Sequence, residues 1–206
     1  MYPQDGRGRC GNSPNRRLWT TLVAVSATHW NERYRQGEHA SDPPLDFIAR
    51  LLPAGERRQA LDIACGAGRH SVLMAERGWL VTAVDWSEAA LALVRARDAR
   101  IHTVLADLEA GGFAVEPERW DLICVSYFLD RSLLSAIGTG LAVGGLLAAA
   151  FPLVDQREGI RPMRREFLLE PGELRALFDG FEILHYYERE PAVPKRRGVE
   201  LLARRL

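Results

Sequence analysis

The 206-residue chain is long enough to form one domain that buries most of the surface its unfolded state exposes. Apolar residues make up 47% of it and charged residues 26%, as in an ordinary globular protein. Because 27 basic residues balance 27 acidic ones, composition gives no electrostatic case for nucleic acid or an anionic membrane surface as a partner.

The chain has three cysteines, Cys10, Cys65 and Cys124, which lie far apart in sequence. They form no C-x-x-C pair, and no histidine stands near them at the spacing of a zinc site. We therefore predict reduced thiols, as in a cytoplasmic protein, and no metal ion.

The N-terminal residues 1–17 are rich in Gly, Pro, Arg and Asn and are expected to form a disordered tail before one domain over residues 18–206. Residues 16–27 loosely imitate a signal peptide, but their apolar run is short. No stretch approaches the roughly 20 apolar residues of a transmembrane helix. A soluble, cytoplasmic protein is the expectation.

Two short helices are predicted before the first strand. Residues 28–36 would place Trp30 and Tyr34 one turn apart on the same face of a helix. The apolar positions of residues 45–52 also have helical spacing. We expect residues 28–52 to form an N-terminal helical lid.

Short apolar runs then alternate with amphipathic segments. The expected strands cover residues 59–64, 80–85, 101–107, 121–128 and 145–151, and the expected helices cover residues 69–78, 87–99, 132–141 and 170–178. Such alternation predicts a parallel sheet with right-handed crossovers and helices on both faces. Residues 181–190 and 199–206 read as two strands with no helix between them, which predicts an antiparallel hairpin. The predicted fold is a seven-stranded, Rossmann-like α/β sandwich, mostly parallel, with a C-terminal antiparallel hairpin.

The sequence LDIACGAGRHS, residues 61–71, joins the first strand to its helix. Gly66 and Gly68 let the backbone approach a ligand closely. Asp85 ends the next strand about 20 residues further on, where an acid can bind ribose hydroxyls. Because ligands of open parallel sheets bind outside the carboxyl ends of the strands, these residues together predict a cofactor site.

The side chains around the turn favour a cofactor without phosphates. A dinucleotide site, G-x-G-x-x-G/A, would have Gly or Ala where Ser71 stands. Asp62 would repel a pyrophosphate but can accept a hydrogen bond from an ammonium group. A ligand with a ribose, an amino group and no phosphate is S-adenosylmethionine. The alternative is a NAD-dependent oxidoreductase, which Ser71 and the terminal hairpin disfavour.

At these positions the sequence resembles the class I S-adenosylmethionine-dependent methyltransferases. LDIACGAGRHS is similar to their first motif, VTAVDWS to the ribose segment, LADLE to the adenine segment and WDLICVSYFL to the fourth motif. W-N-x-R-Y, A-C-G-x-G-R and FLLEPGELRALFDGFEILHYYE also resemble the tellurite-resistance (TehB-like) methyltransferases, whose members act on small substrates such as tellurite or selenite.

The resemblance implies which residues bind the cofactor. It assigns Asp62, Cys65, Gly66 and Gly68 to the methionine end, Asp85 to the ribose, and Trp86, Asp107 and Leu108 to the adenine. It places Ser126 near the sulfonium, and His70 borders the same turn.

Candidates for the acceptor side come from three segments. Tyr127 and Arg131 follow the fourth strand and are the predicted catalytic residues. Arg161 and Arg164, in the loop after the fifth strand, and Tyr34 in the lid are predicted to bind substrate. Arginines suit oxyanions because their donors fork onto two oxygens. We expect methyl transfer to a small molecule, a metalloid oxyanion or a thiol, by a monomer or homodimer.

One residue departs from the family pattern. Relatives carry His before the arginine that follows the fourth motif, and Asp130 stands there in this chain. An acid at that position would repel an anionic acceptor. It keeps open a third interpretation, an inactive S-adenosylmethionine-binding interaction module.

Overall fold

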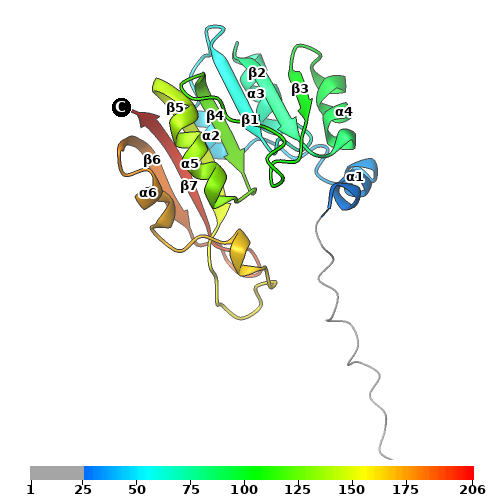
Figure 1. Cartoon of the computed structure of the whole chain (residues 1–206). Coiled ribbons are helices and arrows are strands. Elements are labelled where there is room, and N and C mark those ends of the chain that lie inside the picture. The colour runs from blue at the N-terminus through cyan, green and yellow to red at the C-terminus, as the bar shows by residue number, and fades with distance from the viewer. Residues whose placement is uncertain (1–25) are drawn as a thin grey trace, which may run out of the picture.

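The computed structural model describes residues 26–206 (Figure 1). The predicted tail over residues 1–17, Cys10 and most of the signal-like segment lie outside the described residues. The described chain builds a single seven-stranded sheet with the strand order β3-β2-β1-β4-β5-β7-β6.

The seven strands lie close to their predicted positions. They are β1 (Gln59–Ile63), β2 (Leu80–Asp85), β3 (His102–Leu105), β4 (Trp120–Ser126), β5 (Leu141–Pro152), β6 (Phe181–Arg189) and β7 (Gly198–Arg205). Strands β1 to β5 pair in parallel, whereas β7 pairs antiparallel with both β5 and β6. The predicted terminal hairpin is confirmed. Because β7 is inserted between β5 and β6, the carboxyl end of β6 returns to the same edge of the sheet as those of β1 and β4.

The helices also match the predicted segments. They are α1 (Ala27–Arg35), α2 (Asp46–Leu51), α3 (Arg69–Glu76), α4 (Glu88–Arg97), α5 (Arg131–Gly140) and α6 (Glu173–Leu177), with a short 3-10 helix at Arg165–Phe167. Helix α6 begins later than predicted because Gly172, its N-cap, is in the left-handed region at φ +80°. No helix within residues 26–206 has the length and apolar character needed to cross a bilayer.

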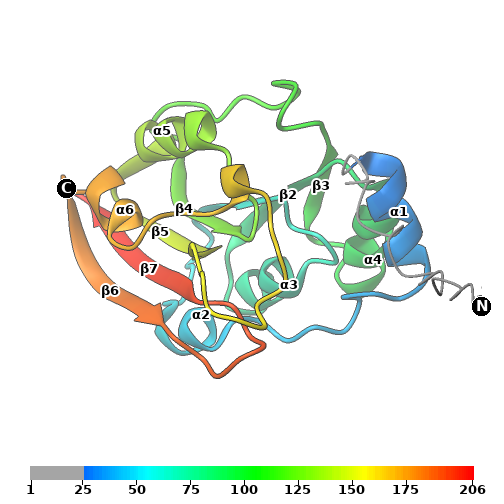
Figure 2. The same cartoon turned by 90° about the horizontal axis from the view of Figure 1, so that it is seen from below.

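Helices cover both faces of the sheet (Figure 2), and a hydrophobic core lies on each face. On one face, α5 and α6 bury Ile137 and Leu174 in a core that includes residues of β4 and β5. On the other face, α2, α3 and α4 bury residues such as Phe47, Met74 and Leu91. Burial on both sides explains why the central strands read as continuous apolar runs.

Helix α1 lies beside α4 at the carboxyl edge of the sheet (Figure 1). The side-chain oxygen of Asn31 accepts hydrogen bonds from the Ser87 hydroxyl and the Ala89 backbone N–H, both at 2.9 Å. Trp30 and Tyr34 stack with ring centroids 5.8 Å apart, which confirms that they share one face. The N-terminal helix is thus attached to the first turn of α4, directly after β2.

Candidate active site

The glycine turn, residues 64–68, leaves β1 at the carboxyl edge of the sheet. Ala64, Gly66 and Gly68 all have positive φ angles, of 51°, 56° and 78°. A Cβ on Gly68 would lie 2.7 Å from a methyl group of Val94, so glycine there allows the start of α3 to pack against α4. Positive φ at three of five positions gives a tight turn whose backbone is presented at this edge.

Asp85 connects this turn to the end of β2. One of its carboxylate oxygens accepts the Gly66 N–H and the other accepts the Ser87 N–H, both at 2.9 Å. The residue is 6% exposed, and burial raises its pKa, although the backbone donors oppose the shift. Each carboxylate oxygen has a further lone pair, so Asp85 fits a ligand that offers two hydroxyls.

Tyr34 of α1 covers the turn from outside. Its hydroxyl lies where a Cβ on Gly66 would come within 2.5 Å of it. Burial and the nearby charge of Asp85 raise the pKa of Tyr34 well above its usual range. The predicted substrate-binding residue therefore lies over the predicted cofactor turn.

Asp62 and Ser71 lie beneath the turn. The Ser71 hydroxyl donates a 2.5 Å hydrogen bond to the Asp62 carboxylate. Asp62 is 1% exposed, and burial raises its pKa to about 7. Ser71, which stands where a dinucleotide site would have Gly or Ala, thus has a structural partner. The predicted contact of Asp62 with an amino group stays a prediction, because its carboxylate is enclosed below the backbone.

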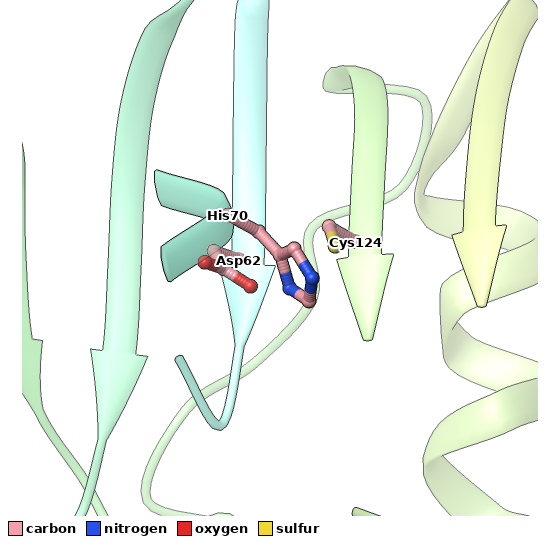
Figure 3. A group of neighbouring side chains, drawn as sticks. All are labelled: Asp62, His70 and Cys124. Atoms are coloured by element: carbon pink, nitrogen blue, oxygen red, sulfur yellow. The ribbon is translucent and has the colours of Figure 1, made fainter. Parts of the chain in front are cut away.

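His70 and Cys124 lie beside Asp62 (Figure 3). Asp62 on β1 and Cys124 on β4 are register partners, and His70 points at them from α3. Their ligand atoms all lie within 4.8 Å of one another, a proximity that the sequence spacing did not indicate. We therefore asked whether this group fits a metal ion.

The hydrogen bonds of the group do not suit a metal ion. His70 Nε2 accepts the Leu45 backbone N–H at 3.3 Å, which assigns the ring proton to Nδ1, 3.5 Å from the Ser126 hydroxyl. No lone pair of the imidazole is then free. Burial lowers the pKa of His70 to about 3, so it stays neutral, and burial keeps the Cys124 thiol protonated by raising its pKa. The group supports the turn from below, and His70 lies between Ser126 and the backbone of Leu45.

The remaining predicted cofactor residues gather at the same edge. Cys65 is 8% exposed in the turn, Trp86 is half-buried after β2, and Leu108 is half-buried against the core. Asp107 is exposed, and its carboxylate accepts the N–H groups of Glu109 and Ala110. Their contacts with a cofactor stay predictions.

Tyr127 follows β4 at this edge and is 48% exposed, with a strained φ of 62°. An arginine from a distant strand, Arg189 at the end of β6, donates to its hydroxyl at 3.0 Å. The Arg69 guanidinium lies over the Tyr127 ring, 5.4 Å from its centroid, and 3.5 Å from the Ser126 hydroxyl. Sequence reasoning named neither arginine. Arg69 is visible within the turn motif itself, whereas no local signal marks Arg189.

The three arginines predicted for the acceptor side are not among the arginines that contact Tyr127. Arg131 donates to the Glu173 carboxylate at 2.8 Å and to the Leu168 carbonyl at 3.0 Å, so it connects the start of α5 to the segment before α6. Arg164 forms an ion pair with Glu166, and Arg161 is exposed. Arg131 thus has a bracing contact in the structure, and its catalytic role stays a prediction.

The departure at Asp130 has a local explanation. Its side chain is the N-cap of α5 and accepts the backbone N–H groups of Ser132 and Leu133 at 2.8 and 3.3 Å. Although burial opposes the shift, hydrogen bonds from the Ser132 hydroxyl and from these N–H groups lower the pKa of Asp130. An acid at this position therefore stabilises a helix start, and its presence does not argue for an inactive protein.

Comparison with known proteins gives matches of three kinds. Residues 60–145 match a family described as a methyltransferase domain. Trans-aconitate 2-methyltransferase of Delftia acidovorans is 29% identical over 82% of this chain and 65% of its own length. Malonyl-[acyl-carrier protein] O-methyltransferase of Salmonella typhimurium is 33% identical over 61% of this chain and 52% of its own. The chain spans about half to two thirds of the length of these curated relatives.

Among solved structures, TehB from Haemophilus influenzae superposes with a TM-score of 0.65 at 23% identity, over 85% of this chain and 67% of that protein. At this identity the likeness shows the fold. The strand order is that of the Rossmann-like methyltransferase fold, and residues 60–145 match a methyltransferase domain. S-adenosylmethionine is the cofactor typical of class I methyltransferases, the class that this fold and this match indicate.

Proposed function

We propose that the protein transfers a methyl group from S-adenosylmethionine to a small-molecule acceptor. The observation that carries the proposal is the hydrogen bond from the Gly66 N–H to Asp85, which joins the glycine turn to the acid of the next strand. The hydrogen bond holds the backbone of the glycine turn and the Asp85 carboxylate, which can accept hydrogen bonds from ribose hydroxyls, at the same edge of the sheet. Ser71 stands where a dinucleotide site would have Gly or Ala, which supports a nucleoside cofactor over NAD.

When bound, S-adenosylmethionine supplies an electrophilic methyl group that needs no further activation. The tasks left for this chain are binding, alignment and exclusion of water. The glycine turn and Asp85 hold the nucleoside and the methionine end, and Tyr34 covers them. Ser126, the last residue of β4, and Tyr127, directly after it, face the region where an acceptor would approach.

We propose an oxyanion as the acceptor group. The tellurite-resistance resemblance favours a metalloid oxyanion, and the fold shared with TehB from H. influenzae supports it at the level of architecture. The relatives by sequence are named for trans-aconitate and for malonyl-[acyl-carrier protein]. Trans-aconitate and the malonyl group both carry carboxylates, so an anionic oxygen group is common to these named compounds and to tellurite.

A thiol is the second candidate acceptor. The cytoplasmic location and the 28–52 lid remain part of the proposal.

Calorimetric titration tests the cofactor. We expect S-adenosylmethionine and S-adenosylhomocysteine to bind and NAD to give no heat. Asp179→Asn, an exposed acid outside this edge, is the matched control for variants of Asp85. If NAD binds and neither S-adenosylmethionine nor S-adenosylhomocysteine does, the proposal is refuted and the oxidoreductase alternative is favoured.

Transfer of labelled methyl tests the reaction. The acceptor panel contains tellurite, selenite, trans-aconitate, small thiols and phenols. Turnover of an oxyanion is the expected result. Adenosyl binding without turnover of any member would favour the interaction-module interpretation.

A further inference from the structure

Two guanidinium groups meet at Tyr127 from opposite parts of the chain. Arg69 begins α3 directly after the glycine turn, and Arg189 ends β6, two strands away from β5 in the sheet order. Arg189 donates to the Tyr127 hydroxyl at 3.0 Å, and Arg69 lies over the ring at 5.4 Å from its centroid. Both arginines thus border an exposed tyrosine at the carboxyl edge.

Gly198 leaves the space that the Arg189 guanidinium needs to contact Tyr127. It pairs with Arg189 across the β6–β7 hairpin, and the Arg189 guanidinium lies over its backbone. A Cβ on Gly198 would stand 2.9 to 3.2 Å from three guanidinium atoms. Any side chain there would displace the guanidinium, so a glycine in this strand keeps open the space through which Arg189 reaches Tyr127.

The two guanidinium groups keep unused donors. Among the described residues no carboxylate lies within salt-bridge distance of Arg69, and its one side-chain hydrogen bond is the long contact with Ser126. Arg189 has Glu200 at 3.6 Å, but its buried Nε makes no hydrogen bond within residues 26–206. Because Tyr127 accepts a hydrogen bond from Arg189, its own hydroxyl proton is free to be donated. The cluster therefore offers several donors and net positive charge.

We propose that Arg69, Tyr127 and Arg189 form the site that binds the oxyanion of the methyl acceptor. The inference rests on the proposed function and names the residues of its acceptor side. It names Arg69 and Arg189 as the binding arginines in place of Arg161 and Arg164. A guanidinium on each side of a hydroxyl donor suits a carboxylate or a metalloid oxyanion, because forked donors match two oxygens of one group.

The test uses the full chain saturated with S-adenosylhomocysteine and titrated calorimetrically with sodium selenite and with trans-aconitate. We expect at least one of these anions to bind, and the trimethyl ester of trans-aconitate to give no heat. Arg189→Gln should weaken anion binding by at least about tenfold, because it removes a charge-assisted contact. Arg69→Lys keeps the charge but loses the fork, and should weaken binding by roughly fivefold.

Gly198→Ala and Arg204→Gln complete the set. Gly198→Ala keeps both charges but displaces the Arg189 guanidinium, and should weaken anion binding as Arg189→Gln does. Arg204, on the same hairpin, pairs with Glu182 at 2.8 Å, and Arg204→Gln is expected to bind anions like the wild type. Circular dichroism checks that each variant is folded.

The outcomes separate the two proposals. Failure of S-adenosylhomocysteine to bind would refute the proposed function itself. Normal adenosyl binding with no affinity for either anion, or equal anion affinity in Arg189→Gln and the wild type, would overturn the oxyanion site. A loss of adenosyl affinity in Arg189→Gln with unchanged anion binding would also overturn it, because Arg189 would then bind the cofactor carboxylate.

Discussion

The hydroxyl of Tyr34 lies so close to Gly66 that a side-chain carbon on Gly66 would come within 2.5 Å of it. Helix α1 therefore packs directly against the glycine turn, which begins about 30 residues after Tyr34 in the chain. The contact joins α1, part of the proposed lid, to the backbone that we propose binds the cofactor, so one pair of variants can test both proposals.

Gly66→Ala should lower the affinity for S-adenosylhomocysteine by at least about tenfold, because φ +56° is unfavourable for alanine and the new Cβ meets the Tyr34 hydroxyl. Tyr34→Phe removes that oxygen and leaves the ring 3.4 Å or more from the same Cβ. The double variant should regain part of the lost affinity in calorimetry. Purely additive losses would contradict a direct contact.

Asn31→Ala should detach α1 from α4, because two hydrogen bonds to the Asn31 side chain are lost. Hydrogen exchange of residues 27–35 is expected to rise by about tenfold or more, since each such bond contributes about 1 kcal/mol. Asn31→Asp retains the accepting oxygen and is the control. Unchanged exchange in the alanine variant would show that packing alone holds the helix.

Asp85→Asn should reduce adenosyl affinity by at least about tenfold, because it removes the charged acceptor for ribose hydroxyls. One amide oxygen can still accept a backbone N–H, so the fold is retained. Asp85→Ala loses both the Gly66 and Ser87 bonds and should lower the free energy of unfolding by about 1–3 kcal/mol as well. A dissociation constant equal to that of the wild type would refute the assignment of Asp85 to the ribose.

Asp62 predicts a defined dependence of stability on pH. Burial raises its pKa from 3.8 to about 7, so the folded state holds a proton that the unfolded state releases above about pH 4. Its contribution to stability is complete below pH 4 and is lost as the pH rises to about 7, at up to about 1.4 kcal/mol per pH unit.

Asp62→Asn removes this titration and leaves the other groups in place. The difference in unfolding free energy between the wild type and the variant, measured in urea at pH 5, 6, 7 and 8, should shift in favour of the variant up to pH 7 and then level off. A difference that stays constant over this range would contradict the assignment.

Arg131→Ala distinguishes the bracing contact from the predicted catalytic role. Loss of the contacts with Glu173 and Leu168 should increase hydrogen exchange between residues 165 and 173. The rate constant kcat should fall only as far as this segment is loosened, and Arg131→Lys should restore part of it. A large fall in kcat with unchanged exchange would instead support direct participation.

Local chemistry was enough to predict the order of the elements. Strand β2 was predicted at its observed bounds and helix α4 to within two residues at each end, because apolar runs act over a few residues. The terminal hairpin followed from two adjacent strands without a helix between them. Gly66 and Asp85 were predicted to meet because parallel strands end at one edge, and the structure joins them by a hydrogen bond.

Contacts between distant segments were decided by the tertiary structure. The insertion of β7 between β5 and β6 brings Arg189 to Tyr127, 62 residues away, and the absent side chain of Gly198 leaves its path open. His70 joins Asp62 and Cys124 because α3 folds onto the face that β1 and β4 share. The sequence by itself determined the glycine turn, since its residues lie within one strand–helix unit. The strand order decided that Arg189 reaches Tyr127, because side chains from distant strands come into contact only after the sheet has assembled.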